Sequence, residues 1–221
     1  MTRRSRRLPT AAAATLLAAA AALALLAGCQ GGKSRTEHIS GEGPLQSHTA
    51  AGVTSVYAPK SVPWAVTFGS FVLCTTNGEP ITLDGVRYRA PVAPEKVSAQ
   101  LRTVTPALQR ETVDAGQIGA ALGRPHHFLN RKAPGRYEAF RPGRRITQNC
   151  AEQDREGTGF TELVFVLDIG AQGGLVDRAW IDYHAGGTAY TLRLEWKMVA
   201  CGGRVPRTVD GTEVCGGRQG V

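Results

Sequence analysis

Residues 190–198 read YTLRLEWKM, and this stretch decides the fold class. Large apolar side chains alternate strictly with polar ones, so each set falls on one face of an extended chain. The apolar set is Tyr190, Leu192, Leu194, Trp196 and Met198, and the polar set is Thr191, Arg193, Glu195 and Lys197. We therefore predict a half-buried β-strand with one face on the core and the other in water.

Two more strands are predicted just before this one. Residues 160–169 and 175–183 are strand candidates separated by the glycine-rich stretch 170–174, and residues 185–187 lead into the strong strand. We expect the three strands to form an antiparallel meander. The run Leu163–Leu167 is apolar on both faces, so its strand should lie in the centre of a sheet and be covered.

Earlier in the chain, the pattern again favours strands. Trp64–Cys74 and Pro80–Arg89 flank the turn signal Asn77-Gly78 and predict a hairpin. Residues 97–102 alternate and predict a further strand. The best helix candidate, Ala115–Leu122, contains two glycines and would be short.

Short strands, glycine-rich turns and little helix predict an all-β, mainly antiparallel fold. We expect a β-sandwich, with an immunoglobulin-like arrangement as one form of it. No internal repeat is evident in the sequence.

The N-terminus has the layout of an export signal. Four arginines lie within the first seven residues, no acid precedes Glu37, and residues 11–27 are apolar apart from Thr15. The run ends in Leu26-Ala27-Gly28-Cys29, which resembles the lipobox of bacterial lipoproteins. The resemblance implies that the signal is cut before Cys29, that a diacylglycerol is attached to its sulfur, and that the protein is held at the extracytoplasmic side of the cell membrane.

This layout divides the chain into three parts. Residues 1–28 are the signal peptide, residues 29–60 are the lipidated cysteine and a flexible tether, and residues 61–221 are a single β-rich extracytoplasmic domain. The tether is predicted because residues 30–60 are polar and their isolated apolar residues show no period. A retained transmembrane helix and an ordinary secretory signal are the alternatives for the N-terminus. The general secretory and twin-arginine export routes both stay open.

The cysteine count predicts two disulfides. Lipidation of Cys29 leaves four cysteines, an even number in an oxidising location, and three pairings are open. We favour Cys201–Cys215, because both residues begin a Cys-Gly-Gly-Arg tetrad and turn residues lie between them, and hence Cys74–Cys150. A zinc site is the alternative, but the cysteines lack Cys-x-x-Cys spacing and no histidine lies near the C-terminal pair.

Charge is concentrated in residues 124–145. Without the four signal-peptide arginines, 22 basic and 18 acidic residues remain, and this arginine-rich composition resembles that of uncharacterised exported lipoproteins of high-GC Gram-positive bacteria. Residues 124–145 carry seven cations and one acid, Glu138, among prolines, glycines and aromatic residues. We predict an irregular loop, and we favour a solvated loop whose aromatic residues cover the edge of the core, since charge runs are usually solvated. The alternative is a loop that binds an anionic envelope polymer or acidic headgroups. The candidate anion-binding residues are then Arg131, Lys132, Arg136, Arg141, Arg144 and Arg145. Nucleic acid is not an expected partner.

One weak catalytic pattern is present. Asp182 and His184 lie two residues apart near the end of a predicted strand, so they share a face and could form a base or a weak metal site. A solvent-facing stripe is the alternative. His126 and His127 are adjacent and should point apart. The sequence has no Gly-x-Ser-x-Gly, His-Glu-x-x-His or phosphate-binding loop, and we predict no catalytic residue, metal ligand or cofactor.

These observations favour a non-catalytic lipoprotein, a binding module or a structural component of the envelope. Its partner would be an anionic polymer, a small ligand or a protein, and charge reversal at Arg141, Arg144 and Arg145 should then abolish binding. The alternative is a hydrolase or metal-dependent enzyme in which Asp182 and His184 converge in a pocket.

Overall fold

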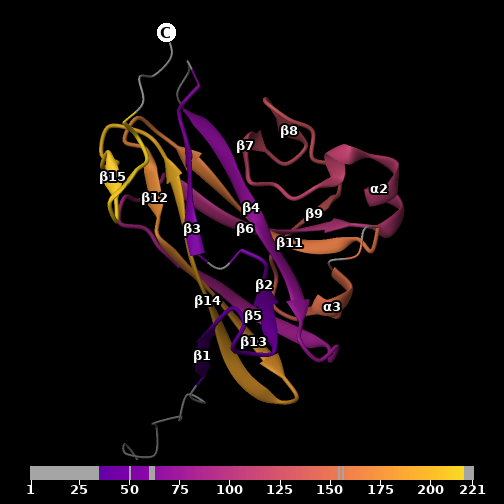
Figure 1. Ribbon diagram of the computed structural model, residues 1–221. Coiled ribbons are helices and arrows are strands. Elements are labelled where there is room, and N and C mark those ends of the chain that lie inside the picture. The colour runs from indigo at the N-terminus through magenta and orange to yellow at the C-terminus, as the bar shows by residue number, and fades with distance from the viewer. Residues whose placement is uncertain (1–34, 50, 60–62, 154, 156, 217–221) are drawn as a thin grey trace, which may run out of the picture. The chain divides into compact units, whose positions relative to one another are not determined.

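The computed structural model describes residues 35–49, 51–59, 63–153, 155 and 157–216 (Figure 1). All of them belong to one structural unit, which begins at Arg35. The predicted signal peptide and Cys29 lie outside the described residues.

The unit is built almost entirely from strands. They are β1 (Thr36–Ile39), β2 (Leu45–Ser47), β3 (Ala51–Val56), β4 (Trp64–Thr75), β5 (Ile81–Arg89), β6 (Lys96–Val104), β7 (Ala120–Arg124), β8 (His127–Phe128), β9 (Arg136–Ala139), β10 (Arg144–Ile146), β11 (Phe160–Ile169), β12 (Gly174–Val176), β13 (Arg178–Ala185), β14 (Thr188–Ala200), β15 (Thr208–Val209) and β16 (Thr212–Glu213). The helical segments are α2 (Pro106–Glu111), the 3-10 turn η1 (Val113–Ala115) and α3 (Cys150–Gln153).

Two sheets packed face to face confirm the predicted all-β sandwich. Sheet A has the order β1-β14-β13-β5-β10, with β3 and β12 also paired to β14. Sheet B has the order β8-β7-β4-β11-β6-β9, with β2 also paired to β4. Among the described strands, β1 and β3 join β14 in parallel, and the other strand pairings are antiparallel.

The core lies between the two sheets, and the stretch 190–198 supplies part of it as predicted. Leu192, Leu194 and Met198 of β14 have no exposed area. On sheet B, the rings of Phe71 and Phe165 meet edge to face with centroids 5.7 Å apart. Burial of each such side chain contributes about 1.5–3 kcal/mol before the loss of entropy is subtracted.

Sheet B is covered on its outer face as well. Val164 of β11 points away from sheet A and packs with Ile118 and Ala133, while Phe160 packs with Ala115. These partners come from residues 105–135, which we call the covering segment; its elements α2, β7 and β8 lie on one side of β4 and β11 in Figure 1. The covering segment explains why β11, which lies between β4 and β6, is apolar on both faces.

The predicted tether over residues 29–60 is wrong for the part that the structure describes. Strand β1 pairs with β14 from Thr36 opposite Tyr190, and β3 pairs with β14 from Ala51 opposite Glu195. Strand β2 pairs with β4. Strands β1 and β3 are held mainly by backbone hydrogen bonds to β14, a strand about 150 residues later in the sequence. Such bonds need no apolar period and so leave no periodic signal.

A buried polar cluster fixes this N-terminal segment. His38 is only 7% exposed; its Nδ1 lies 2.8 Å from the Ile39 carbonyl oxygen and its Nε2 lies 2.6 Å from the Tyr183 hydroxyl. This pattern assigns the proton to Nδ1, so Tyr183 donates to Nε2. The Tyr183 oxygen also accepts from the Leu45 N–H at 3.3 Å, and burial raises the pKa of Tyr183 to about 12. Tyr183 therefore connects β13 to both β1 and β2.

Two predicted strand pairings are also wrong. The Asn77-Gly78 turn is present, with Gly78 at φ +73°, but it carries the chain from β4 in sheet B to β5 in sheet A and makes no hairpin. Strand β11 lies in sheet B, whereas β13 and β14 pair in sheet A, so the predicted meander is reduced to one hairpin. An apolar pattern indicates which face of a strand is buried, but it does not indicate which strand lies next to it.

The predicted helix over Ala115–Leu122 does not form, whereas the strand predicted over residues 97–102 lies within β6. Ala115 ends η1, and β7 begins at Ala120. The backbone groups between them bond to side chains of sheet B: the Gly116 carbonyl accepts from Arg102, and the Ile118 N–H donates to Glu162. These tertiary hydrogen bonds replace the backbone hydrogen bonds of a helix. A helix is also disfavoured here because two glycines would lose conformational entropy in it.

Both predicted disulfides are confirmed. Cys74 at the end of β4 is bonded to Cys150 at the start of α3. Cys201 is bonded to Cys215, which closes a loop that carries the hairpin β15–β16. In the chain-entropy account, closing a loop of about 15 residues stabilises the fold by about 3 kcal/mol.

We predict that Tyr183→Phe destabilises the protein by about 1–3 kcal/mol, because His38 and the Leu45 N–H lose a buried partner. Tyr190→Phe is the matched control: its ring stacks on Tyr183 with centroids 5.3 Å apart, and its hydroxyl has no hydrogen bond among the described residues. Urea denaturation of the three proteins measures the difference. Equal stability of both variants would contradict the role assigned to the Tyr183 hydroxyl.

Candidate ligand-binding site

The candidate site is built on a fully buried ion pair. Arg102 of β6 and Glu162 of β11 lie directly opposite each other, and neither side chain has any exposed area. Arg102 Nη1 lies 2.9 Å from Glu162 Oε2. Burying two charges costs several kcal/mol per ion unless every donor and acceptor finds a partner, so the surroundings of the pair are informative.

Glu162 is satisfied by two backbone donors in addition to Arg102. The Ser70 N–H donates to Oε1 at 2.5 Å, and the Ile118 N–H donates to the same oxygen at 2.9 Å. Ser70 has φ +70° and lies in a β-bulge, where β4 places Gly69 and Ser70 opposite Val164 alone. Burial raises the pKa of Glu162, and the Arg102 charge and the donated hydrogen bonds act against that rise.

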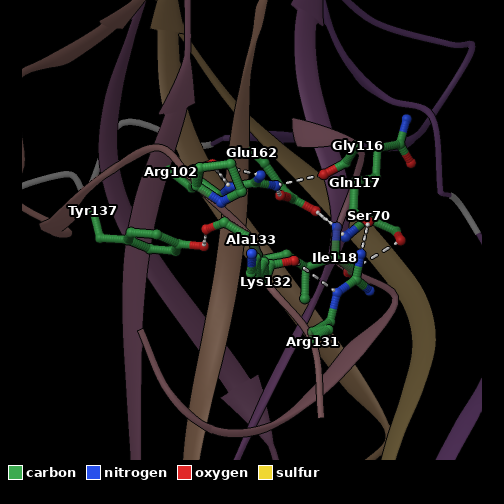
Figure 2. A network of polar contacts seen from close by, with 11 residues as sticks. Ser70, Arg102, Gly116, Gln117, Ile118, Arg131, Lys132, Ala133, Tyr137 and Glu162 are labelled. Carbon is green, nitrogen blue, oxygen red and sulfur yellow. Dashed lines mark hydrogen bonds and ion pairs between the residues drawn. The ribbon is translucent and has the colours of Figure 1, made fainter. Parts of the chain in front are cut away.

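Arg102 holds the covering segment at two points. Nη1 donates to the Gly116 carbonyl at 2.8 Å, while Nε and Nη2 donate to the Pro134 carbonyl at 3.1 and 2.7 Å (Figure 2). A Cβ at Gly135, which has φ +145°, would lie 3.1 Å from Arg102 Cγ and from the Thr103 carbonyl oxygen. One guanidinium therefore fixes both ends of residues 116–134 against sheet B.

Tyr137 of β9 makes a third contact that holds the covering segment. Its hydroxyl donates to the Ala133 carbonyl at 2.7 Å, and its ring lies 5.9 Å from the Arg102 guanidinium carbon. Burial raises the pKa of Tyr137 to about 12, against the lowering effect of the nearby Arg102 charge. The rings of His126 and Phe128 meet Tyr137 edge to face at 5.1 and 6.2 Å. Aromatic side chains thus pack beside the fixed backbone of residues 133–134.

A pocket of about 500 Å³ opens beside this network. It is lined by Thr112, Asp114, His126, Phe128, Arg131, Lys132, Ala133 and Pro134. Arg131 is held by a hydrogen bond from Nη2 to the Gln117 carbonyl at 3.3 Å, and Figure 2 shows Arg131 and Lys132 beside the buried ion pair. Neither cation has an acidic partner within 4 Å among the described residues, so both charges are available to an anion.

The rim of the pocket combines a strained turn with apolar side chains. Pro125 and His126 form the two-residue loop between β7 and β8, and His126 has φ +68°, a conformation that usually takes glycine. Val113 and Leu129 are 99% and 75% exposed, and each is a chain neighbour of a lining residue. Backbone strain of this kind is often found where a fold supports a binding site.

The six predicted anion-binding residues separate into three pairs. Arg131 and Lys132 line the pocket. Arg136 and Arg144 both pair with Glu138, at 3.3 and 2.5 Å. Arg141 and Arg145 are exposed and form no ion pair among the described residues. The predicted irregular loop, residues 124–145, also contains β8, β9 and the start of β10. Strand β9 lies at the edge of sheet B, and β10 lies at the edge of sheet A.

Asp182 and His184 share the outer face of β13 but do not form a joint site. The Asp182 carboxylate accepts two hydrogen bonds from Arg87, at 2.9 and 3.0 Å, and one from the Thr191 hydroxyl at 2.6 Å. His184 pairs instead with Asp84, which also binds Arg35. Each residue is engaged by its own neighbours. In the described part of the chain, no group of three His, Cys, Asp or Glu residues is placed to hold a metal ion.

Sequence reasoning missed the Arg102–Glu162 pair. One signal pointed to it: Glu162 immediately precedes the apolar run 163–167, whose strand was predicted to be central and covered. A charge in a covered strand must have a buried partner. The pattern could not show that the partner is Arg102, because the pairing of β6 with β11 is a tertiary feature.

Comparisons with protein-family models, with curated proteins and with solved structures each returned no match. The immunoglobulin-like form of the sandwich therefore stays a prediction. No helix among the described residues is long and apolar enough to cross a membrane.

We predict that Glu162→Gln destabilises the protein by about 3–5 kcal/mol, because it leaves the buried Arg102 charge without its counter-ion. Asp168→Asn is the matched control, since Asp168 pairs with Arg124, whose side chain is 55% exposed, and should cost at most about 1 kcal/mol. Equilibrium urea denaturation of both variants measures these changes. A loss of less than 1 kcal/mol for Glu162→Gln would show that the pair is dispensable.

A pH prediction follows from Asp182. Burial acts to raise its pKa, but the hydrogen bonds from Arg87 and Thr191 and the charges of Arg87 and Arg35 outweigh burial, so the pKa is lower than 3.8. A carboxyl with a depressed folded pKa stabilises the protein above its unfolded pKa and loses that contribution as the pH falls. Since Arg87 is 56% exposed, we expect Asp182→Asn to cost at most about 1 kcal/mol near neutral pH.

Urea denaturation at about pH 6 and about pH 3 tests whether the contribution of Asp182 to stability is lost as the pH falls. The difference in the free energy of unfolding between the parent protein and Asp182→Asn should be smaller at the lower pH. A difference that grows on acidification would mean that the pKa of Asp182 is raised, as a general base would require.

Proposed function

We propose that this protein is a non-catalytic binding module of the cell envelope, anchored by a lipid on Cys29 to the extracytoplasmic face of the cell membrane. Its ligand is an anionic envelope polymer, which binds at the pocket around Arg131 and Lys132. One observation carries the proposal: two cations without acidic partners line a concave site whose backbone is fixed from below.

Preorganisation supports binding at this pocket. The carbonyl groups of Ala133 and Pro134 are held by Tyr137 and Arg102, and the Arg131 side chain is held by the Gln117 carbonyl. The pocket wall is therefore ordered before a ligand arrives, and little conformational entropy is lost on binding. Arg131 offers a guanidinium fork suited to a phosphate or carboxylate group, and Lys132 adds a mobile point charge.

The other lining groups match a polymer that carries its charges on a carbon skeleton. The hydroxyl of Thr112 and the carboxylate of Asp114 can hydrogen-bond to polyol groups, and the Phe128 ring offers an apolar wall. A chain of alternating phosphate and polyol units presents all of these chemistries in sequence.

The anchor and its location are supported by the lipobox resemblance and by cysteine usage. Besides Cys29, the proposed mature chain has four cysteines, and all four are paired in disulfides. Disulfides persist in oxidising compartments such as the space outside the cell membrane. A polymer of the envelope is the anionic ligand that a protein in that location meets at high concentration.

We predict that Arg131→Glu combined with Lys132→Glu weakens binding of poly(glycerol phosphate) to the full-length protein by at least about tenfold, since each nearby cation contributes about 1 kcal/mol. Arg141→Glu combined with Arg145→Glu is the matched control, because it changes the net charge of residues 124–145 by the same amount. Calorimetric titration at two salt concentrations measures both affinities.

Two results would contradict the proposal. Loss of binding only in the Arg141/Arg145 variant would place the polymer at the sheet edge and exclude the pocket. No saturable binding by the parent protein at low salt would exclude an anionic polymer as the ligand. Weakening of binding by added salt is the expected signature of contacts between cations and phosphates.

A further inference from the structure

A second cleft lies on the other side of the sandwich. Its floor is the outer face of sheet A, formed by β14, β13 and β5, and its roof is the loop that the Cys201–Cys215 disulfide closes. The roof contributes Pro206 and the strand β15, which Figure 1 shows in yellow beside β12. The cleft has a volume of about 640 Å³, within the range of about 300–1,000 Å³ that is typical of small-ligand sites.

The roof is fixed at both ends. The disulfide holds its base, and the ion pair between Lys197 of β14 and Asp210 holds its tip at 2.6 Å. Asp210 and Gly211 form the two-residue turn between β15 and β16 with φ +46° and φ +76°, as the tight turns of such hairpins require. The cleft is therefore a preformed feature of the fold.

Charges of both signs line the cleft in equal number. The cations are Arg89, Arg178 and Lys197, and the acids are Asp177, Glu195 and Asp210. Arg89 binds Asp177 through two hydrogen bonds at 2.9 and 2.6 Å, and Lys197 binds Asp210. A purely anionic ligand would face the three acids, and a purely cationic ligand would face the three cations.

The third pair differs from the other two because it is open. Arg178 Nη2 lies 3.8 Å from Glu195 Oε1, which is too long for a hydrogen bond. The Arg178 guanidinium has no hydrogen bond among the described residues, and its Nε is buried without a partner. Among the described residues, the Glu195 carboxylate has one further ion-pair partner, Arg193, whose Nε lies 3.3 Å from Oε1. The Arg178 guanidinium, which has unused donors, and the Glu195 carboxylate, which has unused acceptor capacity, therefore line the cleft side by side.

We propose that this cleft binds a short zwitterionic peptide. Its carboxylate binds the Arg178 guanidinium and its ammonium group binds Glu195, so that both open charges are satisfied without disrupting the two closed pairs. Leu175 and Val209 supply apolar contacts to the peptide between its ends. The site lies on sheet A and is independent of the anion pocket on sheet B.

Three tripeptides with one skeleton test the proposal on the full-length protein. Triglycine carries both charges, N-acetyltriglycine lacks the ammonium group, and triglycine amide lacks the carboxylate. We expect triglycine to shift the amide resonances of Leu175 and Val209 saturably in NMR titrations. Each capped peptide should bind at least about tenfold more weakly, since one charge-assisted hydrogen bond is lost.

Variants then assign the contacts. Arg178→Gln and Glu195→Gln should each weaken triglycine binding by at least about tenfold, whereas Arg204→Gln, an exposed position outside the cleft lining, should leave it unchanged. Thermal unfolding checks that each variant is folded. Equal binding of N-acetyltriglycine and triglycine would show a simple anion site, and absence of a saturable shift with triglycine would show that the cleft takes no zwitterionic peptide; either result overturns the proposal.

Discussion

The buried ion pair between Arg102 and Glu162 is the interaction on which the covering layer of sheet B depends. Residues 105–135 bury a few apolar side chains against sheet B, among them Ala115, Ile118 and Ala133, but α2 has no buried residue. They are held because Arg102 binds the Gly116 and Pro134 carbonyls while Glu162 binds the Ile118 N–H. A purely apolar contact could not specify these backbone positions, because the hydrophobic effect has no direction.

The same constraint links the core to the surface. Because the network lies beneath residues 131–134, the position of the exposed cations Arg131 and Lys132 follows from a buried contact between two strands. The cleft on sheet A is fixed by different means, a disulfide and the pair Lys197–Asp210. In each case a segment outside the main core is fixed to a sheet by a few directional or covalent links in addition to its apolar contacts.

The features that sequence reasoning identified correctly are local ones. Alternation in residues 190–198 predicted the buried face of β14, and the two-sided apolar run 163–167 predicted a covered central strand. The repeated Cys-Gly-Gly-Arg tetrad predicted the Cys201–Cys215 bond, and the remaining cysteines followed. Local composition also marked residues 124–145 as basic, and Arg131 and Lys132 of that segment line the pocket on sheet B.

The errors concern contacts between residues far apart in the sequence. By itself the sequence determined which residues are apolar, which strands have a wet face and which segment is basic, because these properties depend on residue type and spacing. The tertiary structure decided that β1, β2 and β3 belong to the sheets, that β4 and β5 lie in different sheets, and that Arg102 meets Glu162. Backbone pairing and buried polar contacts depend on which strands become neighbours, and that choice is made only when the whole chain folds.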